Sequence, residues 1–245
     1  AAATKGIRVG MEKGLGLTGT GRGFFQNVFL GKQADAFEAE FGKVNSISTK
    51  TAAQFKIMSF HMGLSAENAA KLTKELELNT DLTKEQSVDM LKTIQGLAKA
   101  ADVAPKEIFE DMAQNSEMFA QFSKDGALGL AEAAIKAKSL GLSLAAVGKI
   151  SQSLLSFESS ISAEFEAQVL TGKMLNLDTA RRLALAGKST EMLDEIVRQV
   201  GGERELRSMN ILALQSLATA VGLSAGELQR VAQGNEISAK NPVVS

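Results

Sequence analysis

Apolar side chains recur along most of this chain at intervals of three and four residues, which is the period of a helix with one buried face. From Thr83 onwards, such a face is formed in turn by Val88, Leu91, Ile94, Ala98 and Ala101. Alternation of Val, Ile and Thr with polar residues, the pattern of a strand, is rare, and only Pro105 and Pro242 interrupt the chain. The pattern predicts an all-α protein, with stacked helical hairpins and one long central helix.

Capping residues indicate where the helices begin and end. Thr83 and Gln86 can form a capping box, and Pro105 suits the first position of a helix because the N–H that proline lacks would have no partner there. Period and caps together predict helices at roughly 47–62, 65–78, 83–102, from 105 through Met112, 126–140, 143–170, 177–186, 189–200, 203–220 and 224–233.

One short pattern recurs between the predicted helices: Gly, then Leu, then Ser. It occurs at 63–65, 141–143 and 222–224, with the variant Asp-Val-Ala-Pro at 102–105. Glycine accepts the left-handed conformation that ends a helix, and serine accepts hydrogen bonds from the first N–H groups of the next helix. Ser224 can also form a capping box with Glu227. We interpret the pattern as a turn that joins helices and not as a functional signature.

The segment from Ser143 to Leu170 carries a narrower apolar row than the others. Its members follow the spacing of three and four residues that is found between supercoiled helices: Val147, Ile150, Leu154, Phe157 and Ile161. After Ile161 the row continues at Phe165 and Val169 with a change of phase. We expect these residues to mediate self-association, with a trimer as the preferred state. The alternative is a central helix that is covered by other helices of the same chain.

Glycines are concentrated near the beginning of the chain, where eight lie between Gly6 and Gly31. Each costs a helix about 1 kcal/mol relative to alanine, so we expect residues 1–31 to be flexible or bound to a partner. We expect a helical region over 32–142, the long helix with C-terminal hairpins over 143–234, and a polar tail over 235–245. No stretch has the roughly 18 apolar residues that a membrane-spanning helix needs, so no membrane contact is expected in this segment.

The composition limits the chemistry that the side chains can provide. The 245 residues include no Cys, Tyr or Trp and one histidine, His61. Acid–base or nucleophilic catalysis would have to rely on Asp, Glu, Lys and Ser, and thiolate metal sites are excluded. With 27 basic and 28 acidic residues, the net charge of −1 gives no overall attraction to nucleic acid. We therefore expect no catalytic activity, no cofactor, no metal and no nucleic-acid partner.

Two short motifs are similar to phosphate-binding loops but lack the required context. Residues 14–19 match G-x-G-x-x-G, although no strand precedes them, and Gly187-Lys188-Ser189 is similar to the end of a P-loop, although position 182 is Arg instead of Gly. We interpret the first as part of a flexible segment and the second as the end of one helix and the beginning of the next.

Residues 217–233 provide an alternative function, because they are similar to a DNA-binding helix-turn-helix. The second helix would present Gln229, Arg230 and Gln233 to the bases. In the preceding helix, two glutamates offset two arginines and weaken the attraction to phosphate. DNA binding is the second hypothesis.

The C-terminal half resembles the helical region of tape measure proteins of tailed bacteriophages. The resemblance is carried by residues 157–161, 163–173, 176–187, 209–210 and 217–228. In such proteins, a helix rich in Ser and Glu leads through Leu, Gly and Lys to a segment like Ala-Arg-Arg-Leu-Ala-Leu-Ala-Gly, here residues 180–187. The resemblance extends well over 157–233 and loosely over 58–150.

This resemblance implies a structural protein of the virion, packed in the lumen or at the tip of a phage tail. It implies contacts with copies of the same chain and with tail tube, baseplate or tail-tip proteins. Two features depart from the family, whose members are usually far longer and often carry apolar, membrane-like stretches. The resemblance therefore implies one ordered piece of a larger tape measure, and a length-setting role is not assigned to these residues alone.

Overall fold

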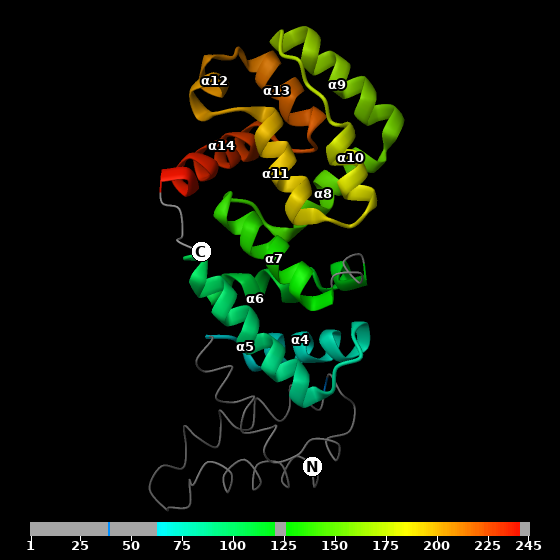
Figure 1. The fold of residues 1–245 in the computed structure, drawn as a ribbon, viewed down its shortest axis with the longest axis vertical. Helices are drawn as coiled ribbons and strands as arrows, with labels where there is room; N and C mark the ends of the chain where they lie inside the picture. The colour runs from blue at the N-terminus through cyan, green and yellow to red at the C-terminus, as the bar shows by residue number, and fades with distance from the viewer. Residues whose placement is uncertain (1–38, 40–62, 121–125, 241–245) are drawn as a thin grey trace, which may run out of the picture. The chain divides into compact units, whose positions relative to one another are not determined.

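The computed structural model describes residues 39, 63–120 and 126–240 (Figure 1). These residues are mostly helical and contain no strand, which confirms the prediction of an all-α protein. The predicted helix at 47–62, the glycine-rich residues 1–31 and the motif at 14–19 lie outside the described residues, as does His61.

The helices begin within one residue of their predicted starts wherever a start was predicted from residue 65 onwards. Their bounds are α4 Ala66–Asn79, α5 Lys84–Ala100, α6 Pro105–Gln114, the 3₁₀ helix η2 Ser116–Ala120, α7 Gly126–Ser139, α8 Leu144–Leu155, α9 Phe157–Thr171, α10 Asp178–Leu185, α11 Ser189–Val200, α12 Glu203–Ser208, α13 Ile211–Ala220 and α14 Ala225–Lys240.

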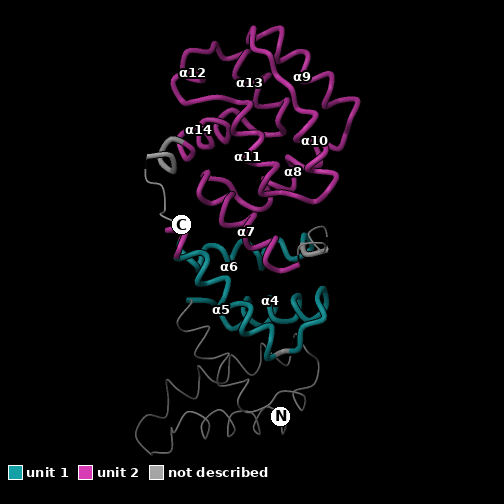
Figure 2. Tube along the Cα trace, in the orientation of Figure 1, with its two compact units in different colours: residues 1–99, 104–119 teal, residues 100–103, 120–245 magenta. Residues whose placement is uncertain are grey.

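The chain forms two compact units, shown in different colours in Figure 2. One comprises residues 1–99 and 104–119, and the other comprises residues 100–103 and 120–245. In the described part of the first unit, α4 packs on α6 around fully buried side chains such as Leu72 and Phe109. The boundary expected after residue 142 falls inside the second unit, because α7 packs on α8, α11 and α14.

The recurring Gly-Leu-Ser turns have the conformation that their sequence predicts. Gly63, Gly141 and Gly222 have φ angles of +66°, +71° and +73°, and Asp102, which replaces glycine in the variant turn, has a φ of +56°. After Gly141 and Gly222, the N–H of the leucine donates to the carbonyl five residues earlier, which closes the end of the preceding helix. Asparagine and aspartate tolerate this conformation better than other non-glycine residues, which explains why an aspartate can stand at position 102, where the other turns have glycine.

The prediction of one uninterrupted helix over 143–170 is wrong. The helix ends at Leu155 and a new one begins at Phe157, because Ser156 has a ψ of 70°. The hydroxyl of Ser156 donates to the carbonyl of Gln152 at 3.0 Å, and the hydroxyl of Ser159 donates to the carbonyl of Ser156 at 2.9 Å. Serine side chains that bond to nearby backbone groups compete with the regular helical pattern, and here they accompany the break.

Two other predicted boundaries also differ from the structure. The single helix expected over 203–220 is divided into α12 and α13, because Asn210 leaves the helical conformation and its side chain accepts a hydrogen bond from the N–H of Ala213 at 2.9 Å. The tail expected from residue 235 begins later, since α14 continues to Lys240. Residues 241–245 lie outside the described part of the chain.

Two of the Gly-Leu-Ser turns in the second unit join the helix pairs α7–α8 and α13–α14, and each turn packs against a helix of the other pair. The α13–α14 turn approaches α8 so closely that a Cβ at Gly222 would lie 2.7 Å from the Cβ of Ser153. The α7–α8 turn lies against α14, where Arg230 Nε donates to the carbonyl of Gly141 at 3.1 Å. Each of these two helix pairs therefore contacts the other through its turn, and α9 packs mainly on α13 (Figure 1).

Candidate interaction surface

The exposed face of α9 carries its largest apolar side chains. Phe157, Ile161, Phe165 and Val169 are 49%, 43%, 63% and 81% exposed, and they follow one another at intervals of four residues. The buried side chains of the same helix are small, namely Ser160 and Ala167. This arrangement is the reverse of an ordinary surface helix, whose large apolar side chains face the core. We call these four residues the α9 row.

A buried ion pair explains why the inner face of α9 is polar. Arg181 of α10 is only 4% exposed, and its Nη2 donates to Oε2 of Glu164 on α9. Its Nε donates to the hydroxyl of Ser160 at 3.0 Å, and its Nη1 donates to Oδ1 of Asp178 at 2.8 Å. Glu164 also accepts the backbone N–H of Leu177 at 3.3 Å through its other oxygen. The inner face of α9 therefore holds α10 by polar contacts.

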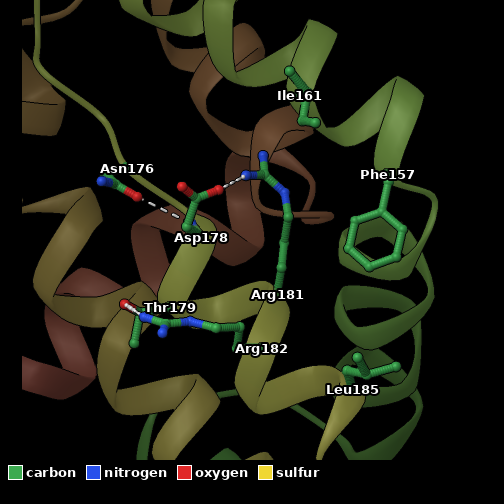
Figure 3. Close-up of a pocket in the computed structure, with 8 residues that line it drawn as sticks. All are labelled: Phe157, Ile161, Asn176, Asp178, Thr179, Arg181, Arg182 and Leu185. Atoms are coloured by element: carbon green, nitrogen blue, oxygen red, sulfur yellow. Dashed lines mark hydrogen bonds and ion pairs between the residues drawn. The ribbon is translucent and has the colours of Figure 1, made fainter.

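A pocket of about 530 Å³ opens beside the N-terminal half of the α9 row. It is lined by Phe157, Ile161, Asn176, Asp178, Thr179, Arg181, Arg182 and Leu185. Figure 3 shows Arg181 between two sets of these side chains, with Asn176, Asp178 and Thr179 on one side and Phe157 and Leu185 on the other. Leu185, at the end of α10, is 68% exposed. One wall of the pocket is therefore apolar and continuous with the α9 row.

The structure divides the five residues that the sequence predicts for self-association. Val147, Ile150 and Leu154 belong to α8, and each is fully buried in the core of the second unit. Phe157 and Ile161 belong to α9 and are exposed. The five therefore form no continuous surface, because the break at Ser156 separates the buried part of the row from the exposed part.

Sequence reasoning identified only some of the residues that complete the surface. Phe165 and Val169 were recognised only as a continuation of the row, although their spacing of four already departs from a coiled-coil seam. The contribution of Leu185 and the pairing of Arg181 with Glu164 had no signal in the sequence, because both depend on how α10 folds back against α9.

The motif Gly187-Lys188-Ser189 is a junction between two helices, as predicted. Gly187 has a φ of +75° after α10, and α11 begins at Ser189.

In the described part of the chain, no group of three His, Asp or Glu side chains is placed to hold a metal ion. Within the same part, no single helix is long and apolar enough to span a membrane, and α13 with the first part of α14 passes that test only as a pair bent by 80°.

Two of the three side chains that would read DNA in a helix-turn-helix, Arg230 and Gln233, already have partners within the chain. Arg230 donates to Gly141, and Gln233 Nε2 donates to Oε1 of Glu203 at 3.0 Å. At the start of α14, the hydroxyl and the backbone N–H of Ser224 donate to Glu227 and lower the pKa of its carboxyl. The first turn of this helix therefore carries an ionised carboxylate where a recognition helix would approach phosphates.

Comparison with protein-family models, with curated proteins and with solved structures finds no match to this chain.

Proposed function

We propose that this chain is a helical structural segment of a phage tail tape measure protein, and that α9 provides its surface for assembly. The observation that carries the proposal is the exposed α9 row, which lies within the residues that resemble tape measure proteins. Contiguous apolar side chains on a protein surface typically mark an interaction site. The proposed location is the lumen or the tip of the tail.

The proposed partners are other copies of this chain and tail tube, baseplate or tail-tip proteins. The expectation of a trimer rests on the likeness of tape measure proteins to threefold bundles and on a β-branched and aromatic seam, which does not clearly favour a dimer. With Val147, Ile150 and Leu154 in the core, Phe157 and Ile161 are the only residues of the predicted seam that are exposed, as part of the α9 row. Self-association is therefore proposed for α9 alone.

The test of the virion proposal is the protein content of the particles. Phage particles produced from the genome that encodes this reading frame are purified, and tails are separated from capsids. Peptides from residues 157–233 should be recovered from the tail fraction at a fixed ratio to the tube protein. Their absence from purified tails, when they are abundant in infected cells, would exclude a structural role in the virion.

DNA binding through residues 217–233 remains the second candidate function. One observation favours it, since α13 and α14 meet at 80° through a short turn, as the two helices of a helix-turn-helix do. A gel-shift assay at two salt concentrations tests it, because contacts with phosphates weaken steeply as salt increases. A specific, salt-sensitive shift would favour DNA binding, and no shift at low salt would exclude it.

A further inference from the structure

The α9 row has a geometry that restricts how a second helix can pack on it. Its members are spaced by four residues throughout, so they form one ridge inclined to the helix axis. Helices that pack through two such ridges cross at about 50°. A supercoiled bundle instead needs alternating intervals of three and four residues. The α9 row therefore fits a short crossed contact better than a lengthwise bundle.

The pocket beside the row is large enough to receive a side chain from a molecule that packs on α9. Its volume of about 530 Å³ lies within the range of about 300–1,000 Å³ that is typical of ligand pockets, so a phenyl ring fits inside. Phe157 and Ile161 belong to both the pocket and the row. A helix that crosses α9 on the row would bring its own side chains to the mouth of this pocket.

We propose that a second copy of this chain occupies the surface, with the two α9 helices antiparallel and Phe165 of each copy inserted into the pocket of the other. If the twofold axis lies at the level of Ala163, Ile161 faces Phe165 of the other copy. Phe165 then reaches the apolar wall formed by Ile161, Phe157 and Leu185. The same contact occurs twice, as in any twofold interface. This inference deepens the assembly role proposed above for α9 by specifying its partner.

The charges on α9 favour the antiparallel direction. Glu158 and Glu166 are exposed, Glu164 is committed to Arg181, and the helix contains no Lys or Arg. In a parallel pair, Glu158 and Glu166 would each lie level with the same residue of the other copy, and like charges repel. In the antiparallel pair, Glu158 lies level with Gln168 and Glu166 lies level with Ser160. No carboxylate then faces another across the contact.

The exposed area predicts a reversible dimer. Each side chain of the row exposes on the order of 100 Å², and the two copies together would bury roughly 1,000 Å², the lower limit for a specific interface. Leu170 and Met174, which are 42% and 90% exposed near the end of α9, add to this area. We therefore expect a dimer at about 100 μM that dissociates at low micromolar concentrations.

Two variants of the complete chain test the two halves of the contact. Phe165→Ala removes the inserted ring, and Leu185→Lys places a charge at the pocket while preserving the end of α10, where a cation is favourable. Each should raise the dimer dissociation constant by at least about 10-fold in sedimentation equilibrium. Leu78→Lys is the matched control, because Leu78 is also 68% exposed and also lies in the last turn of its helix. It should dimerise like the unmodified chain, and circular dichroism should show equal helix content in all three variants.

A mixture of the two variants distinguishes this dimer from binding of a different molecule to the same surface. In a mixed dimer, Phe165 of the Leu185→Lys copy meets the intact pocket of the Phe165→Ala copy, so one of the two contacts is restored. Mixing should therefore yield more dimer than either variant alone. A monomeric unmodified chain at about 100 μM, a trimer, or no gain on mixing would each overturn the proposal. These outcomes are independent of the tail location, which the content of the particles tests separately.

Discussion

At the scale of single residues, the close packing of the second unit depends on glycines that have no substitute. Gly222 combines a left-handed conformation with contacts on α8, where an added Cβ would lie 2.7 Å from the side chain of Ser153 and 3.1 Å from the backbone of Ile150. Gly172 has nearly the same φ of +67° but no neighbour within 4 Å of the position that a Cβ would occupy. Comparison of substitutions at the two positions therefore separates the cost of the left-handed conformation from the cost of a clash with α8.

Gly222→Ala should lower the free energy of unfolding by about 2–5 kcal/mol, from left-handed strain together with a clash against α8. Gly172→Ala should cost only about 1–2 kcal/mol, because strain acts alone. Urea titrations of both variants provide the comparison. Equal losses at the two positions would mean that α8 moves away from the turn at little cost.

The pairing of Arg181 with Glu164 is also a property of individual residues. Their side chains are 5% and 12% exposed. Removal of one partner from a buried pair leaves the other charge without compensation, which costs about 3–5 kcal/mol. Arg181→Met should therefore lower the free energy of unfolding by about this amount, and Arg181→Met combined with Glu164→Leu should recover most of the loss.

The exposed pair of Lys92 and Asp89 is the control for this cycle. Lys92→Met should change the free energy of unfolding by less than about 1 kcal/mol, because exposed pairs contribute little. The interpretation of Arg181 as a buried structural charge would be wrong if its replacement had an effect as small as that of Lys92→Met in urea titrations.

At the level of the helices, capping boxes define where some of them begin, and two that differ in chemistry lie within the described residues. In the first, the backbone N–H of Thr83 donates to the side chain of Gln86 at 2.8 Å, and the N–H of Gln86 donates back to the threonine hydroxyl at 3.3 Å. In the second, Ser224 and Glu227 make the same exchange at 2.9 and 3.3 Å. Only the second contains an ionisable group.

Glu227→Ala should lower the free energy of unfolding by about 1 kcal/mol at neutral pH, and the loss should shrink in acid. The pKa of Glu227 is lowered in the folded chain by the hydrogen bonds from Ser224. Its contribution is therefore complete above the ordinary carboxyl value of 4.5 and is lost as the pH falls through the lower folded value. Urea titrations of this variant and the unmodified chain between about pH 7 and pH 3 measure the change.

Gln86→Ala is the neutral counterpart. It should lower the free energy of unfolding by a similar amount, about 1 kcal/mol, and this loss should not vary with pH. A loss at Glu227→Ala that stayed constant down to pH 3 would mean that the carboxylate contributes through its size and not through its charge.

At the scale of the whole molecule, the second unit contains a core of its own. Fully buried side chains come from at least six of its helices, including Leu130, Ile150, Ala180, Val200, Leu217 and Leu228. A chain of this length buries enough apolar surface to fold independently. The first unit supplies none of these residues.

The fragment 120–245 should therefore fold without the rest of the chain. We expect a helical circular dichroism spectrum and one sigmoidal urea transition, with a slope of about 1–3 kcal/mol per molar urea. A gradual loss of helix signal, without such a transition, would mean that the second unit depends on residues before 120.

Most of the helices, and the first residues of those predicted from residue 65 onwards, follow from the sequence alone. Capping boxes at Thr83 and Ser224, proline at 105 and the left-handed glycines act within a few residues of each other, so their effects can be predicted from local spacing. The same locality explains why the all-α class follows directly from the period of the apolar residues.

Which apolar residues lie in the core and which lie on the surface depends on contacts between distant segments of the chain. Val147, Ile150 and Leu154 continue into Phe157 and Ile161 in the sequence, yet the break at Ser156 buries the first three and exposes the last two. The burial of Arg181 and the opening of the pocket depend on α10 lying against α9 across a connection of six residues, 172–177. The apolar period of a helix indicates that a face will be covered, but only the packing of distant segments decides whether this chain or another covers it.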